Sequence, residues 1–170
     1  MAQLVHLMKV EFARARRYRL PLTFLVLSID RLNDLSRNFG YKARDLVIER
    51  FRAILRRDTR NCDFIGRMRE DRILLVLPHT DVKGAKVLAE RIRRTMAAQE
   101  FHFEAKAFRV TLSAGICPFG NRDTTLFFDA MRDAADEAAN RASASGDAVV
   151  VVEARDDTAG AAKPETARRE

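Results

Sequence analysis

Two apolar runs separated by a charged turn, between Phe64 and Pro78, most constrain what this chain can fold into. The second run, residues 73–77, is apolar at every position and ends at Pro78. Two such runs joined by the polar residues 69–71 predict a β-hairpin. Because the second run is apolar on both alternating faces, we expect it to be a central strand of a sheet, buried on both sides.

The residues before this hairpin predict one strand among helices. Residues 3–19 carry apolar side chains at helical spacing and a cluster of arginines, which predicts an amphipathic helix. We expect its apolar face to pack on the body of the domain, although a partner or a second copy could also cover it. Leu20-Pro21 ends this helix, and residues 22–29 predict a buried strand. A short helix over 30–38 should stop at Phe39-Gly40, and a second helix follows over 44–57. The inward stripe expected for the second helix consists of Leu46, Val47, Phe51, Ile54 and Leu55.

After the hairpin, Asp81 can cap a helix that ends near Ala97, with Val87 among its buried residues. Residues 101–104 and 107–114 predict two strands, and residues 115–123, with Pro118 and Gly120, predict a loop. A long helix should start at Thr124 or Thr125 and run to about residue 143, and a last strand is expected over 148–153. The order predicts an α/β (α+β) domain: a five-stranded sheet plus a minor strand pair, with helices on both faces. We expect a lead-in helix over 1–19, one domain over 20–154 and a disordered tail over 155–170.

The charge balance indicates an anionic partner without identifying it. The 170 residues include 31 Lys and Arg against 24 Asp and Glu, a formal net charge of +7. Such a balance suits nucleic acid, a membrane surface or an anionic small ligand. The basic residues are dispersed among acidic ones and no nucleic-acid motif is present, so we expect no nucleic-acid partner. Two cysteines without metal-type spacing fit a reducing, cytoplasmic setting. We expect no membrane insertion, because no apolar run could cross a bilayer, and no signal peptide.

Several segments match one family in order and spacing. They are PLTFLVLSIDRLNDLSRNFGYKARD, RMREDRILLVLP, DVKGAKVLAERIRRTM, VTLSAGICPF and AADEAANRASASGDAVVV. From about Arg14 to Val152 the chain resembles the bacterial GGDEF, or diguanylate cyclase, family. The resemblance implies a nucleotidyl-cyclase-like α/β unit built around an antiparallel sheet.

The family's signature, Gly-Gly-Asp/Glu-Glu-Phe, aligns with Arg69-Glu70-Asp71-Arg72-Ile73. The two glycines of the family let the turn approach GTP, and Arg69 and Glu70 would fill that space. Side chains at positive φ are strained, so we expect a longer or differently shaped turn here. Asp71 keeps the family's metal-binding carboxylate, whereas Arg72 replaces an acid.

Other substrate positions of the family are changed as well. Its second metal-binding carboxylate aligns with Ser28, and Asp30 matches a further aspartate. Ser36 and Leu32 replace the residues near the base, although Asp45 matches the guanine-reading aspartate. Ser143 and Asp147 stand where the family neutralises the triphosphate with lysine and arginine. Because phosphoryl transfer depends on metal and charge neutralisation, the resemblance implies a catalytically inactive domain without bound magnesium.

The family's product-binding motif, Arg-x-x-Asp, is retained as Arg60-Asn61-Cys62-Asp63. In the family this motif binds cyclic di-GMP as an inhibitory site. Arg91 matches another arginine of that site, and Arg14 aligns with an arginine that reaches the same ligand from a second copy. The resemblance therefore implies ligand binding by Arg60, Asp63, Arg91 and Arg14.

These features give three hypotheses. The first is a cyclic di-GMP receptor that signals through self-association or a protein partner. The second is a ligand-independent scaffold that binds a protein through the N-terminal helix or the altered hairpin tip. The third is a residual cyclase. Substitution of Arg60 separates the first two, because a receptor would lose function and a scaffold would keep it.

Overall fold

The central strand of the structure is β1 (Leu22–Ile29), in which every residue is buried. The computed structural model describes residues 2–119 and 127–153. β1 pairs antiparallel with β3 (Arg72–Pro78) on one side and with β6 (Leu112–Phe119) on the other. β2 (Phe64–Arg67) extends the sheet beyond β3, and β7 (Val149–Val151) extends it beyond β6. The resulting order is β2-β3-β1-β6-β7, and only the β6–β7 pair of this sheet is parallel.

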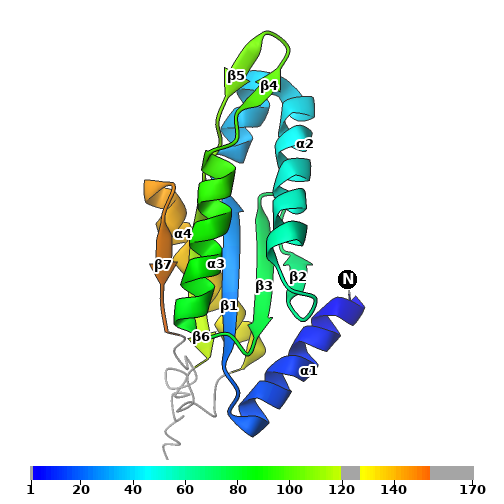
Figure 1. Ribbon diagram of the computed structural model, residues 1–170, viewed down its shortest axis with the longest axis vertical. Coiled ribbons are helices and arrows are strands. Elements are labelled where there is room, and N and C mark those ends of the chain that lie inside the picture. The colour runs from blue at the N-terminus through cyan, green and yellow to red at the C-terminus, as the bar shows by residue number, and fades with distance from the viewer. Residues whose placement is uncertain (1, 120–126, 154–170) are drawn as a thin grey trace, which may run out of the picture.

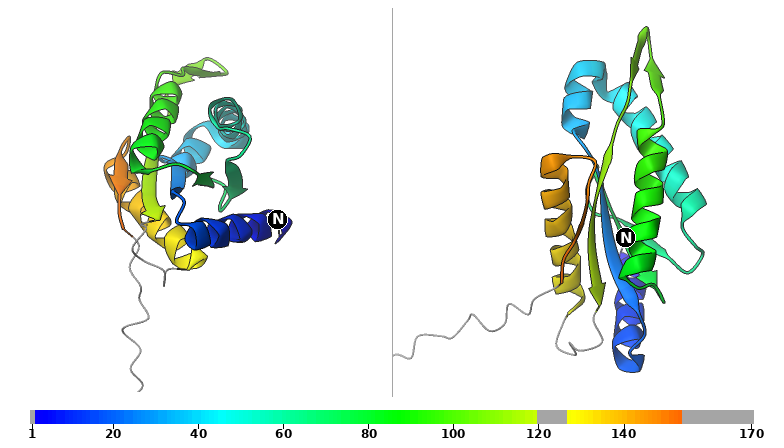
Figure 2. Two further views of the ribbon diagram at one scale, coloured as in Figure 1. Left: turned by 60° about the horizontal axis from the view of Figure 1, so that its bottom comes forward. Right: turned by 60° about the vertical axis from the view of Figure 1, so that its left-hand side comes forward.

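Alternation along β1 distributes its side chains between two cores. Leu25 and Leu27 belong to a cluster with α2 (Leu32–Asp58) and α3 (Val82–Ala97). Phe24 and Val26 belong to a second cluster with α1 (Ala2–Tyr18) and α4 (Phe128–Ser145). Figures 1 and 2 show the result, with α2 and α3 on one face of the sheet and α1 and α4 on the other. The predicted α/β architecture with helices on both faces is confirmed.

The N-terminal helix packs on the body of the domain, as predicted. Met8, Phe12 and Ala15 are buried against the sheet. The Phe12 ring makes edge contacts with Phe24 at 6.0 Å and with Phe128 at 6.1 Å between ring centroids. α1 therefore completes one of the two cores of the fold.

The two helices predicted on either side of Gly40 form α2, which is kinked at this residue. Gly40 has φ 81° and ψ 172°, a conformation that glycine adopts without steric cost. Val47, Phe51, Ile54 and Leu55 form the buried stripe, whereas Leu46 is 39% exposed, contrary to the prediction. In α3, Asp81 caps the helix by accepting from the Gly84 amide, but Val87 is 64% exposed instead of buried.

The predicted strand over 107–114 and loop over 115–123 are wrong in their boundaries. β4 (Phe101–Phe103) and β5 (Lys106–Phe108) form a separate hairpin, and β6 continues through Gly115 and Pro118 to Phe119. Gly115 serves helix packing: a Cβ there would lie 2.2 Å from both the Ala135 carbonyl oxygen and the Ala139 nitrogen. α4 spans Phe128 to Ser145 and stops at Gly146, so the end predicted at Ser145-Gly146 is confirmed, whereas the start predicted at Thr124 or Thr125 lies outside the described residues.

The hairpin between β2 and β3 is confirmed, and its turn is built without positive φ. The Met68 and Arg69 amides donate to the Arg72 carbonyl, and the Arg72 amide donates to the Arg69 carbonyl. None of these turn residues has positive φ, so Arg69 and Glu70 adopt the turn without that strain. The expected tail over 155–170 lies outside the described residues. Among the residues that the structure describes, no helix is long and apolar enough to cross a membrane.

The close packing at Gly115 makes a first prediction. We expect Gly115→Ala to destabilise the domain by about 3 kcal/mol, because the added methyl collides with helix backbone, which cannot rotate away. Urea unfolding followed by circular dichroism measures this. Gly84→Ala is the control: its Cβ would meet the Thr80 methyl at 3.1 Å, and we expect a change of about 1 kcal/mol or less. Equal stability of Gly115→Ala and the parent chain would contradict the packing role of this glycine.

Candidate functional site

The turn at residues 60–63 is ordered by its own aspartate. α2 ends at Asp58, and the Thr59 amide and hydroxyl both donate to the Leu55 carbonyl, at 2.9 and 2.7 Å. The Arg60 amide donates to Asp63 Oδ2 at 2.7 Å, and the Asp63 amide donates to the Arg60 carbonyl at 3.0 Å. The Arg60 side chain is exposed, and its guanidinium has no hydrogen-bond or ion-pair partner among the described residues. The turn thus presents this guanidinium to solvent on a fixed backbone.

Arg91 of α3 lies beside this turn. Its Nη2 donates to the Asp58 carbonyl at 2.8 Å, two residues before Arg60. This bond satisfies one of the carbonyls at the end of α2 and fixes α3 against it. A surface cavity of about 570 Å³ runs along the same face of α3, and Arg91 and Arg94 are among its lining residues. The structure therefore brings Arg60, Asp63 and Arg91 to one region of the surface.

Arg14 is not part of this region within one chain. It lies on α1, which covers the opposite face of the sheet from α2 and α3. Its side chain is 62% exposed, and the nearest carboxylate is that of Glu11 on the same helix, at 3.8 Å. An approach of Arg14 to the turn would require a second copy of the chain.

The hairpin tip is fastened to α4 and α2 by ion pairs. Asp136 of α4 accepts from Arg72 Nη1 at 2.5 Å and from Arg69 Nη2 at 2.8 Å, so one carboxylate holds two guanidinium groups. The side chains of Arg72 and Asp136 are only 8% and 15% exposed. Glu70 pairs with Arg44 of α2. All three ion pairs involve Arg69, Glu70 or Arg72, the residues that the resemblance aligns with the family's glycines and acid.

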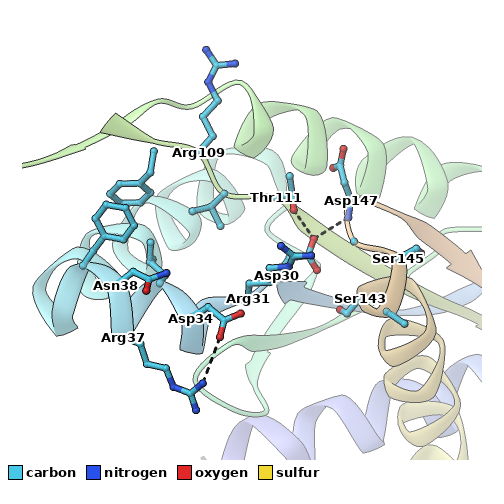
Figure 3. A pocket seen from close by; sticks show the side chains of 16 residues that line it. Asp30, Arg31, Asp34, Arg37, Asn38, Arg109, Thr111, Ser143, Ser145 and Asp147 are labelled. Atoms are coloured by element: carbon cyan, nitrogen blue, oxygen red, sulfur yellow. Dashed lines mark hydrogen bonds and ion pairs between the residues drawn. The ribbon is translucent and has the colours of Figure 1, made fainter. Parts of the chain in front are cut away.

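A cleft of about 810 Å³ opens at the carboxyl end of β1, and Figure 3 shows its lining. Asp30 Oδ2 accepts from the Thr111 hydroxyl at 2.7 Å and from the Asp147 amide at 2.9 Å. Asp147 in turn receives a hydrogen bond of 2.6 Å from Arg93 of α3. Hydrogen bonds to Glu90 first, and then to Asp147, raise the pKa of Arg93. Asp30 and Asp147 therefore join β1, α3 and the turn after α4.

Two buried polar atoms in this cleft are without partners in the described structure. They are Oδ1 of Asp30 and the hydroxyl oxygen of Ser143. A buried carboxylate oxygen without a donor costs free energy, so this end of the cleft can accept a hydrogen bond. The cleft also contains Arg31 and Arg109, so its charges are mixed and the lining does not favour one sign of ligand.

Asp136, Arg93 and Thr111 were not singled out from the sequence. One sequence signal could have indicated a residue such as Asp136. An arginine aligned with a buried hairpin position, as Arg72 is, needs a carboxylate partner from a neighbouring element. For Arg93 and Thr111 no motif was available, because their partners lie 54 and 81 residues away along the chain.

A family model described as diguanylate cyclase, GGDEF domain, matches residues 2–148. The chain belongs to the GGDEF family. The diguanylate cyclase DgcP of Pseudomonas aeruginosa is 33% identical over 145 residues, which cover 85% of this chain and 21% of DgcP. This GGDEF chain thus spans about a fifth of the length of that curated relative.

Solved GGDEF domains share the fold. The active GGEEF domain of a diguanylate cyclase from Vibrio cholerae has a TM-score of 0.80 at 24% identity, covering 92% of this chain and 97% of that one. The GGDEF domain of DgcB from Caulobacter crescentus, solved in complex with c-di-GMP, has a TM-score of 0.78 at 16% identity, covering 85% of this chain and 82% of that one.

The resemblance aligns the family's two metal-binding carboxylates with Ser28 and Asp71 of this GGDEF domain, and only one of these two residues is a carboxylate. Ser28, at the position of one carboxylate, is buried, and its hydroxyl is a neutral group. Asp71 has the Arg72 guanidinium 3.8 Å from its carboxylate. Among the described residues, no group of three or more His, Cys, Asp and Glu could hold a metal ion. Hard cations need oxygen ligands with net negative charge, and the hairpin tip supplies a cation instead.

The shared carboxylate at the hairpin makes a second prediction. We expect Asp136→Asn to destabilise the domain by about 3 kcal/mol, because Arg72 would remain buried without a counter-charge. Urea unfolding measures the change. The matched control is Asp133→Asn on the same helix, where the pair with Arg132 is largely exposed and a loss below about 1 kcal/mol is expected. If the two variants were equally stable, the hairpin would not depend on Asp136.

Proposed function

We propose that this chain is a catalytically inactive GGDEF domain that acts as a cyclic di-GMP receptor through Arg60, Asp63 and Arg91. The observation that carries the proposal is the turn at 60–63, where the guanidinium of Arg60 has no partner although the backbone around it is ordered by Asp63. Arg91 lies beside it, held by the carbonyl of Asp58. The site therefore requires little rearrangement before it accepts an anion.

The chemistry of these residues suits a cyclic dinucleotide. A guanidinium can donate two parallel hydrogen bonds to a phosphate or to the edge of guanine. The carboxylate of Asp63 can accept from guanine N–H donors through Oδ1, whose only hydrogen-bond partner among the described residues is the Cys62 thiol, at 4.0 Å. The related fold of DgcB was solved with c-di-GMP, which supports the same ligand class for this chain.

Two features support the absence of cyclase activity. The first is the hairpin tip, where Arg69, Glu70 and Arg72 align with the family's glycines and acid. These side chains form ion pairs with Asp136 and Arg44. The second is the pair of positions at which the family neutralises the triphosphate, which here carry Ser143 and the carboxylate of Asp147. Transfer of a phosphoryl group needs positive charge at these places, and Asp147 adds negative charge.

Arg14 would link ligand binding to the association of two chains. A stacked pair of cyclic di-GMP molecules carries four phosphate charges, so a further arginine from a second copy would be attracted to it. Ligand binding would then bring two chains together, or a chain and a protein partner. Measurement of the oligomeric state by analytical ultracentrifugation with and without ligand tests this step, and an unchanged state together with unchanged partner affinity would contradict it.

The receptor makes a third prediction. We expect cyclic di-GMP to bind with micromolar or tighter affinity in calorimetry, and Arg60→Ala to weaken binding at least about tenfold, because a charge-assisted contact to phosphate is lost. Arg141→Ala is the control, since this exposed arginine of α4 also has no partner among the described residues. A stoichiometry near two ligands per chain would indicate the stacked pair. Absence of binding by the parent chain would refute the receptor and favour the ligand-independent scaffold.

The inactive hairpin makes a fourth prediction. With GTP and magnesium, we expect no release of pyrophosphate above that of a blank without protein, because the carboxylates and cations of phosphoryl transfer are missing. A coupled pyrophosphate assay measures this. Release that disappeared in Asp71→Ala would show a residual cyclase and overturn the proposed inactivity.

A further inference from the structure

The second half of α2 and the strand β2 enclose a cavity that the proposed ligand site does not use. Its volume is about 310 Å³, and it continues into an outer cleft of about 540 Å³. Five apolar side chains line the inner cavity, of which Ile48 and Ile65 are partly exposed: Ile48, Phe51, Leu55, Ile65 and Ile73. An apolar cavity of this size with a few polar groups at its mouth is typical of small-molecule sites.

Three arginines around this cavity have no partner. Arg52 and Arg56 lie one turn apart on α2, and Arg67 lies at the end of β2. All three are exposed, and none of their guanidinium groups makes a hydrogen bond or ion pair with any described residue. The carboxyl end of α2 favours the charge of Arg56 in its last turn, but Arg52 and Arg67 have no such compensation.

The other charges of the inner cavity are already balanced. Arg69 pairs with Asp136 of α4, and Glu70 pairs with Arg44. Asp45 and Glu49 line only the outer cleft. The lining of the inner cavity holds four arginines and one glutamate, so positive charge is in excess above its apolar floor, and Asp45 and Glu49 lie farther out beside the same arginines. Mutual repulsion opposes this arrangement, and a bound anion would relieve it.

We propose that this cavity binds a small molecule with a phosphate monoester head and an apolar or aromatic body. The body would lie on Ile48 and Ile65, and the phosphate would accept hydrogen bonds from Arg52, Arg56 and Arg67. A doubly charged phosphate matches three guanidinium groups better than a carboxylate does, and each guanidinium can bond two of its oxygens. The arginines supply all the positive charge, so the site requires no metal ion.

This site is separate from the cyclic di-GMP site. Arg60, Asp63 and Arg91 are absent from its lining, and no hydrogen bond or ion pair among the described residues joins the side chains of Arg52, Arg56 and Arg67 to the turn at 60–63. The two sites can therefore be tested one at a time, and loss of one leaves the other to be measured.

The test is a titration with phenyl phosphate, followed by ¹H–¹⁵N NMR at constant ionic strength, with inorganic phosphate as the head-only probe. We expect saturable shifts in residues 48–56 and 65–67. Phenyl phosphate should bind about tenfold more tightly than inorganic phosphate, because the ring leaves water for the apolar floor. In Arg67→Gln the affinity for phenyl phosphate should fall about tenfold, whereas Arg141→Gln should bind like the parent chain. Thermal melts of both variants confirm that they are folded.

Four results would overturn the proposal. Shifts that do not saturate would show diffuse attraction to a basic surface. Equal affinity for the two probes would show that the apolar floor plays no part. An equal loss in Arg67→Gln and Arg141→Gln would remove the cavity as the cause. Shifts confined to residues 60–63 and α3 would assign phosphate binding to the cyclic di-GMP site.

Discussion

The complete burial of β1 is the constraint on which the rest of the structure depends. A strand with no exposed residue must have a strand on each edge and a layer of helices on each face. β3 and β6 supply the edges, and two helices cover each face. This arrangement brings the ends of β1, β3 and α4 together, so the hairpin tip, the turn after α4 and Asp30 become neighbours. The buried strand β1 thus positions these charged residues, although it has no charged residue of its own.

The altered charges at that end of the sheet are compensated within the fold. Arg72 and Arg69 share Asp136, Glu70 pairs with Arg44, and Asp147 pairs with Arg93. A nearly buried cation such as Arg72 would be very costly without Asp136, so the two residues must be kept together. The charged side chains of the hairpin tip are thus used to hold the hairpin against α4 and α2.

The fold was largely predictable, because burial leaves periodic patterns in the sequence. β1 and the helices α1 and α3 lie within about a residue of the predicted ranges. The errors occurred where a residue has a role that no local pattern reveals. Gly115 and Pro118 are typical of a loop, yet Gly115 allows α4 to approach β6. Pro118 lies in β6 beyond the residues that pair with β7, where its missing amide leaves no bond unmade on that side.

The candidate site was only partly predictable, because long-range partners decide it. The motif at 60–63 predicts Arg60 and Asp63, but not that Asp63 binds the amide of Arg60 and leaves the guanidinium unpaired. In a chain with net charge +7, no local sequence pattern predicts which arginines form an ion pair with a carboxylate. Arg72 and Arg93 find one, whereas Arg52, Arg67 and the guanidinium of Arg60 do not.

Four of the unpaired arginines follow one another along the chain. Arg52 and Arg56 lie on the last turns of α2, Arg60 follows that helix, and Arg67 ends the strand that comes next. One continuous stretch, from α2 through the turn to β2, therefore carries these four. β2 has a neighbour on one side only, so this stretch is held less firmly than the centre of the sheet. An anion bound at either proposed site would therefore reduce the repulsion among the arginines nearest to it, at an edge of the domain rather than at its hairpin tip.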